Sequence, residues 1–258
     1  MCLVSGVNLT SGTVNFDPDV GCDQGGPSPG TKPGQAFDWY IENVKKECDS
    51  PGEYFYDVSE DALYYTFNQT DAPTGTEEFV LTRTKVLFNI TGTMDEPVKN
   101  LKIQGLTLRD AAYTYLGTTQ ADRHWLPSEG DWALQRSGAI TIEGAEGVTV
   151  HKNQLTRCDG NGIFLGGYTR NVSITGNDIN WIGDSAIAAF GWTSDCLFAN
   201  CSEKLPDKVG PDGRGGEQPR GTYIGGNLVR EYGIWQKQSS AFFEAIATTT
   251  TIESNVSS

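Results

Sequence analysis

Short runs of alternating apolar and polar residues recur at a fixed interval in the second half of the chain. Residues 148–155 (VTVHKNQL) align position by position with residues 172–179 (VSITGNDI), an offset of 24 residues (148 to 172). Residues 224–233 (IGGNLVREYG) continue the pattern, an earlier copy begins at Leu101 and a later one begins at Ile252. Alternation with a period of two is typical of short β-strands, so each copy predicts strands separated by turns.

The repeat predicts a solenoid, because three short strands in one copy cannot bury their apolar faces alone. Stacked coils would place equivalent strands parallel and about 4.8 Å apart. An asparagine recurs at one position of each copy and predicts an inward ladder of amides at a bend, formed by Asn153, Asn177, Asn227 and Asn255. A propeller needs repeats of about 40 residues and a leucine-rich repeat needs a helix. We therefore expect a parallel β-helix over residues 96–258.

Two insertions interrupt the coils, at about residues 109–136 and 191–220. Both leave beside the same column of strands, so we expect them to wall one face, and long loops on a rigid scaffold commonly carry function. Residues 1–95 do not repeat, and we interpret them as a β-rich cap that shields the first coil. Within it, strands are expected near residues 51–57, 62–67, 79–81 and 86–88. Because nothing covers the coil at Ser258, we expect the β-helix to be C-terminally incomplete.

Net charge and hydropathy limit the classes of binding partner that we expect. The formal net charge is −14, which argues against nucleic acid because phosphates need a basic face. It also disfavours a polyanionic glycan, although the acidity can equally serve only to keep the surface soluble. No run of 18 apolar residues occurs, so we expect no membrane span. We expect a monomer.

Cysteines and glycosylation sequons indicate an oxidising compartment. None of the six cysteines forms a CxxC motif, which disfavours a zinc ribbon; Cys196 with Cys201, or Cys22 with Cys48, could form disulfides, and spacing alone does not fix the pairing. Six of the fourteen asparagines begin N-x-S/T sequons, namely Asn8, Asn68, Asn89, Asn171, Asn200 and Asn255. They predict a secreted glycoprotein, whereas the alternative is that Asn, Ser and Thr are common in turns.

Four motifs resemble those of right-handed parallel β-helix proteins of the pectin-lyase-like superfamily. They are PSEGDW (127–132), SGAITIEG (137–144), DGNGI (159–163) and DSAI (184–187). The tract PGEYFYD (51–57) followed by LYY (63–65) resembles the leading segment of β-helical glycoside hydrolases that act on fucosyl or xylosyl linkages. The resemblance covers roughly residues 40–258 and implies right-handed coils, in agreement with the general crossover rule, and a carbohydrate substrate. Because fold does not imply function, it bears more on the fold than on the activity.

Glycoside hydrolysis needs two carboxyl groups that flank the scissile bond. Asp159 and Asp184 lie at nearly equivalent turn positions of adjacent coils, so their backbones are expected about 6 Å apart. Glu143 and Asp131 are reserve carboxylates. Candidate substrate-binding residues are the aromatic side chains of Trp125, Trp132, Tyr168 and Trp192, together with His124, Arg136 and Lys237. His124 could act as an acid or base, and the two cations could neutralise a carboxylate.

Each candidate also has a structural interpretation. Asp-Gly pairs are common turn formers, tryptophans pack loops, and a histidine in a charged loop is often only solvated. Cys158 shares a column with apolar residues, so we expect a buried thiol. Three functions remain open: a glycoside hydrolase on a polysaccharide or oligosaccharide, a polysaccharide lyase or epimerase, and a non-catalytic glycan-binding or structural β-helix. No cofactor motif or metal-binding spacing occurs.

Overall fold

The computed structural model describes residues 3–17, 41–115, 135–191 and 216–258. The described chain is all-β apart from two short 3-10 helices, η1 (Lys45–Glu47) and η2 (Gln69–Asp71). Two units are distinguished, one of residues 27–81 and one of residues 1–26 with 82–258. No helix in the described ranges is long and apolar enough to cross a membrane.

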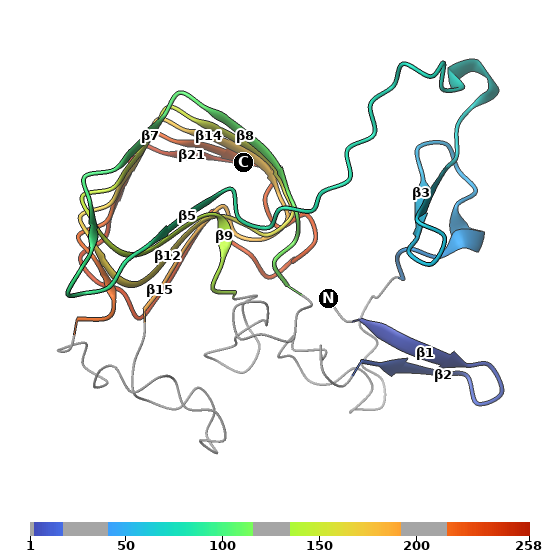
Figure 1. Cartoon of the computed structure of the whole chain (residues 1–258), viewed down its shortest axis with the longest axis horizontal. Helices are drawn as coiled ribbons and strands as arrows, with labels where there is room; N and C mark the ends of the chain where they lie inside the picture. Colours follow the sequence, from blue (N-terminus) through green and yellow to red (C-terminus); the bar gives the residue numbers. More distant parts are fainter. Residues whose placement is uncertain (1–2, 18–40, 116–134, 192–215) are drawn as a thin grey trace. The chain divides into compact units, whose positions relative to one another are not determined.

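Three parallel sheets form the larger unit, and the coils are seen nearly end-on in Figure 1. The first sheet contains β7 (Lys102–Gln104), β10 (Thr149–His151), β13 (Ser173–Thr175), β17 (Tyr223–Gly225) and β20 (Thr251–Glu253). The second contains β8 (Thr107–Ala111), β11 (Gln154–Cys158), β14 (Asp178–Ile182), β18 (Leu228–Arg230) and β21 (Val256–Ser257). The third contains β5 (Phe88–Thr91), β9 (Gly138–Glu146), β12 (Asn161–Arg170), β15 (Ile187–Phe190) and β19 (Phe242–Ala245). Each coil gives one strand to each sheet, which is the arrangement of a β-solenoid.

The register follows the repeat seen in the sequence. Val150 pairs with Ile174 in the first sheet and Leu155 pairs with Ile179 in the second, both at an offset of 24 residues. Their side chains are fully buried in one apolar column, together with Ile163 and Ile187 of the third sheet. The predicted stack of parallel strands is therefore confirmed.

Single residues with positive φ mark the bends of the coil. The bend before the first sheet uses Asn100, Gly147, Asn171 and Gly221; the next uses Gly105, Lys152, Gly176, Gly226 and Ser254; a third set within the second sheet comprises Asp110, Arg157, Trp181 and Glu231. Glycine adopts this conformation without strain and asparagine tolerates it, which explains the first set and the three glycines of the second, but not Lys152 and Ser254. The third set contains no glycine and places four large polar or aromatic residues in one column.

The predicted asparagine ladder is also confirmed. Asn153 Nδ2 donates to Asn177 Oδ1 (3.1 Å), Asn177 Nδ2 donates to Asn227 Oδ1 (2.9 Å), and Asn227 Nδ2 donates to Asn255 Oδ1 (2.9 Å). Each donor amide also donates to a backbone carbonyl; that of Asn177, for example, donates to Val150 O at 3.0 Å. The ladder thus satisfies side-chain and backbone groups that are buried at the bend.

The N-terminal region partly follows the predicted strands. An antiparallel hairpin of β3 (Tyr54–Asp57) and β4 (Ala62–Tyr65) lies where two strands were expected, and a further hairpin joins β1 (Val4–Asn8) to β2 (Thr13–Phe16). The strand predicted at 79–81 is wrong, because those exposed residues have no regular partner. Of the strand predicted at 86–88, only the last residue belongs to a strand, β5, which pairs with β9 of the solenoid.

Coil strands extend into both predicted insertions. β8 continues to Ala111, and the second insertion ends in β16 (Pro219–Arg220), which pairs with β12; the short β6 (Val98–Lys99) pairs with β9. Cys48 is a free thiol, and Cys22, its suggested partner, lies outside the described residues. Burial raises the pKa of the Cys158 thiol to about 11, in agreement with the expected core position. The other four cysteines lie outside the described residues.

Candidate functional site

The end of the first insertion lies beside the start of the second insertion at the third sheet. Arg136, at the end of the first insertion, donates from Nη1 to Phe190 O (3.0 Å) and from Nη2 to Gly191 O (2.7 Å), where the second insertion begins. Its guanidinium carbon also lies 3.9 Å from the centroid of the Phe190 ring. Arg136 therefore joins the bases of both insertions.

Arg136 was predicted to bind substrate, but it is engaged in the scaffold. Its residue surface is 7% exposed, and burial lowers the pKa of the guanidinium to about 9, against the opposing charge of Glu143. Glu143, a predicted reserve catalytic residue, is half-buried on β9. Its carboxylate lies over Gly166 and Gly167, where an added Cβ would be 2.8 Å and 2.5 Å from the nearer oxygens. These glycines leave the room that the Glu143 side chain occupies.

Asp184, a predicted catalytic residue, is completely buried at the turn between β14 and β15. Its Oδ1 accepts from the Ser239 hydroxyl (2.7 Å) and from its neighbour's amide, Ser185 N (2.8 Å), and its Oδ2 accepts from the Gln135 amide. Burial raises the pKa of Asp184 to about 6, and these hydrogen bonds oppose the rise. Asp184 thus joins the end of the first insertion to the loop that follows β18.

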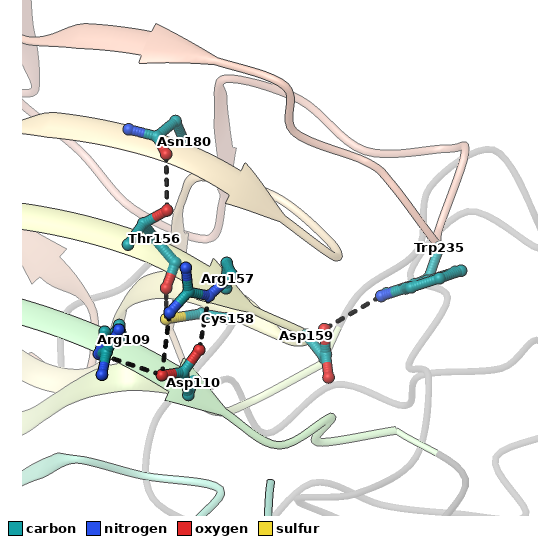
Figure 2. A network of polar contacts seen from close by, with 8 residues as sticks. All are labelled: Arg109, Asp110, Thr156, Arg157, Cys158, Asp159, Asn180 and Trp235. Atoms are coloured by element: carbon teal, nitrogen blue, oxygen red, sulfur yellow. Dashed lines mark hydrogen bonds and ion pairs between the residues drawn. The ribbon is translucent and has the colours of Figure 1, made fainter. Parts of the chain in front are cut away.

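Asp159 lies in the corresponding turn of the preceding coil, after β11, and is only partly buried. Figure 2 shows its carboxyl group at the end of β11, where Oδ1 accepts from the indole Nε1 of Trp235 at 3.1 Å. Burial raises the pKa of Asp159, the charge of Asp110 raises it further, and the indole hydrogen bond opposes both. Asp159 and Asp184, which were predicted to form a catalytic pair, therefore have separate sets of partners.

Another carboxylate, Asp110, lies one coil before Asp159 (Figure 2). Arg157, in the next coil, donates two hydrogen bonds to Asp110, from Nε to Oδ1 at 2.7 Å and from Nη2 to Oδ2 at 3.2 Å. Arg109 forms an ion pair with Oδ2 of Asp110 at 3.2 Å. The hydrogen bond from Arg157 lowers the pKa of Asp110. The site therefore contains one carboxyl group biased toward its protonated form and one biased toward its ionised form.

Aromatic groups border this pair. Trp235 is partly exposed beside Asp159, and Trp181 is 55% exposed on β14. Trp181 follows Asn180, which pairs with Thr156, so it occupies the position next to Arg157 in the following coil. We use the name Asp159 site for Asp110, Arg157, Asp159, Trp181 and Trp235.

Sequence reasoning gave no role to Asp110, Trp181 or Trp235, and it considered Arg157 only as a cation available to a lyase. The first two lie at the same repeat position as Arg157, where the side chain points outward, so the repeat could have indicated them. Trp235 lies in a loop outside the repeat, and no sequence signal connects it to Asp159.

The remaining candidates fall elsewhere. Tyr168 donates its hydroxyl to Glu146 (2.6 Å) and stacks under Arg170, 4.2 Å from ring centroid to guanidinium. Lys237 is exposed, and its ammonium donates to Ile234 O at 2.7 Å in the loop that carries Trp235. His124, Trp125, Asp131, Trp132 and Trp192 lie outside the described residues.

The comparisons with known proteins give no assignment: no family model, curated protein or solved structure matches the chain. In the described part of the chain, no group of three or more His, Cys, Asp or Glu residues could hold a metal ion. Functional inference therefore depends on the chemistry of the site itself.

Proposed function

We propose that the protein is a carbohydrate-active β-helix protein, a glycoside hydrolase that uses Asp159 as its general acid. The observation that carries this proposal is the partly exposed Asp159 carboxyl group, whose pKa is raised, held by Trp235 and flanked by an ionised carboxylate. Two carboxyl groups whose environments move their pKa values apart are typical of an acid and its charged partner.

Each residue has a distinct role in the proposed reaction. Asp159 gives its proton to the glycosidic oxygen while the bond to the anomeric carbon breaks. Asp110 stays ionised and stabilises the positive charge that develops on the sugar ring or activates the attacking water. Arg157 keeps Asp110 charged, and Trp235 orients the Asp159 carboxyl group through its indole hydrogen bond.

The exposed tryptophans supply a binding surface for a sugar chain. An indole face is large, apolar and flat, and its N–H group keeps a polar contact available. Trp181 presents such a face to solvent on the strand next to β11. Asp184 has a positioning role in this proposal, because its hydrogen bonds fix the turn that follows Trp181 and the loop of Trp235.

We extend the proposal to the class and location of the protein. The coils are right-handed and related to the pectin-lyase-like superfamily, and the protein acts outside the cell. Four sequon asparagines, Asn8, Asn68, Asn89 and Asn171, are exposed, which supports glycosylation in a secretory pathway. Asn255, in contrast, uses its amide in the ladder. Glycopeptide mass spectrometry of the native protein would test this, and absence of glycan at all four exposed sites would contradict it.

The catalytic proposal is tested with matched isosteric variants. We expect Asp159→Asn to lower kcat/KM by about 100-fold or more, the range of general-acid contributions, and Asp110→Asn to lower it strongly as well. The control is Asp178→Asn, because Asp178 also pairs with an arginine, Arg230 at 2.9 Å, one coil farther on. Equal activity of Asp159→Asn and the control variant would refute the assignment.

A pH profile adds a second readout. The acidic fall of activity reports the ionised carboxylate and the alkaline fall reports the protonated acid. We expect Asp159→Asn to abolish the alkaline limb in its residual activity, whereas Asp178→Asn leaves both limbs in place. An alkaline limb that persists unchanged in Asp159→Asn would assign the acid to another residue.

A further inference from the structure

The hairpin of β3 and β4 in the unit 27–81 presents two different faces. Residues opposite each other in an antiparallel pair share a face, so Phe55 and Tyr64 lie on one side. Their ring centroids are 6.0 Å apart, and the ammonium of Lys45 lies 3.6 Å from the Tyr64 centroid. That face is therefore occupied by the segment that contains η1.

The other face of the hairpin lines a hollow of about 530 Å³. Its lining residues are Tyr56, Asp61, Leu63, Tyr65, Phe67, Pro73, Phe79 and Leu81. The volume falls within the range typical of sites for small ligands. Tyr65 and Phe79 meet edge to face, with centroids 5.4 Å apart and planes at 69°, and they are 39% and 50% exposed. Two steeply inclined aromatic walls thus remain open to a ligand.

The wall that carries Pro73 and Phe79 is fixed by a turn between them. The Glu77 carboxylate accepts from the backbone amides of Thr74 (2.8 Å) and Gly75 (3.0 Å) and from the Thr74 hydroxyl (3.0 Å). These hydrogen bonds lower the pKa of Glu77 to about 2, so the turn keeps its charged acceptor over the physiological pH range. The Glu77 turn thus braces the chain between Pro73 and Phe79, two residues that line the hollow.

Polar groups inside the hollow are acidic or phenolic. The Tyr56 hydroxyl donates to Asp61 Oδ1 at 2.5 Å, which leaves carboxylate lone pairs for a ligand donor. Asp61 is the one charged residue among those that line the hollow, and none of them is a cation. This charge distribution disfavours anionic ligands and favours a neutral ligand with hydroxyl donors.

We propose that this hollow binds the sugar rings of a neutral oligosaccharide, as a site separate from the Asp159 site. A pyranose ring presents C–H groups on its faces, which pack on Tyr65 and Phe79, and hydroxyl groups at its rim, which donate to Asp61. The inference goes beyond the proposed hydrolase activity and does not require it. In a protein that also cleaves glycans, such a site would raise the local concentration of the chain to be cut.

The test uses the full chain with Asp159→Asn as background, so that no sugar is cleaved. Isothermal titration calorimetry with cellohexaose, xylohexaose, mannohexaose and hexagalacturonate measures binding. We expect at least one neutral hexamer to bind, and Tyr65→Ala and Phe79→Ala each to weaken it about tenfold, the loss expected for one aromatic contact. Val58→Ala, at a turn residue that is 78% exposed and outside the hollow, is the control and should bind unchanged.

Three results would overturn the proposal. They are binding of the acidic hexamer alone, absence of binding to all four sugars, and equal affinity of the two aromatic variants and the control. Thermal unfolding without sugar checks that Tyr65→Ala and Phe79→Ala are folded at the temperature of the titration, because the two rings also contact each other. Tyr65→Phe should retain sugar binding. Because Asp159 is already replaced, failure here leaves the hydrolase proposal to its own test.

Discussion

The buried carboxyl group of Asp184 should make the stability of the solenoid depend on pH in an unusual direction. Its ordinary pKa is 3.8, and burial raises the pKa to about 6 in the folded chain. Between these two values the folded chain binds more protons than the unfolded chain, so the free energy of unfolding falls as pH rises through that window. Most carboxylates that form ion pairs have the opposite effect.

The size of this effect follows from the shift. One pKa unit corresponds to about 1.4 kcal/mol, so a rise from 3.8 to about 6 amounts to about 3 kcal/mol of stability lost between pH 4 and pH 7. Asp184→Asn removes the titrating group and keeps the side-chain shape. Its oxygen can still accept from Ser239, and rotation of the Gln135 amide can restore the other contact. We therefore expect the free energy of unfolding of the variant to increase relative to that of the wild type as pH rises.

Urea unfolding followed by tryptophan fluorescence at pH 4, 5, 6 and 7 measures this difference. The free energy of unfolding of Asp184→Asn relative to wild type should increase by up to about 3 kcal/mol across the series. Asp178→Asn is the control of opposite sign, because the pKa of Asp178 is lowered in the folded chain by Arg230 and Asn180. If the difference in the free energy of unfolding between Asp184→Asn and wild type stays constant with pH, Asp184 does not titrate with a raised pKa in the folded chain.

Three further predictions concern the scaffold. Asn177→Ala should lower the free energy of unfolding by about 3 kcal/mol in urea titrations, because it leaves buried ladder groups without partners; an effect below about 1 kcal/mol would contradict the role of the ladder. Gly183→Ala should displace the Trp235 loop, because an added Cβ would overlap Asp159 O and approach the Trp235 ring to 2.7 Å; an unchanged tryptophan emission spectrum would refute this. Alkylation of the native chain followed by peptide mapping should leave Cys158 unmodified and modify the partly exposed Cys48; early labelling of Cys158 would contradict its burial.

The coils could be predicted because their signal is periodic. The residues at offsets of 24 fixed the register of β10 with β13 and of β11 with β14, and the asparagine column follows from the same alignment. The segment 79–81 lacks such support: its three apolar residues resemble a strand, but no partner strand lies beside them in the described unit. An isolated apolar run carries no information about pairing.

The predicted catalytic pair, Asp159 and Asp184, was harder to predict because alignment of the coils does not fix the direction of a side chain in a turn. Asp159 aligns with Gly183, one position before Asp184, and both aspartates lie in the bend after a strand, where the alternation of a strand no longer sets the direction of the side chain. Asp184 points into the molecule and Asp159 points outward. The turns that contain the two residues lie in adjacent coils, where Asp184 N donates to Gly160 O at 3.2 Å, and their side chains find separate partners in the loop that contains Trp235 and Ser239.

Whether Asp159 donates a proton in glycoside hydrolysis is tested most directly by an assay on a panel of glycans with two measured signals. Released reducing ends report any chain cleavage, and absorbance of unsaturated uronates reports elimination. If Asp159 is the proton donor, at least one glycan releases reducing ends without that absorbance, and this release is lost in Asp159→Asn and retained in Asp178→Asn. Unsaturated products would instead indicate a lyase, and cleavage that survives in Asp159→Asn would contradict the assignment of the acid.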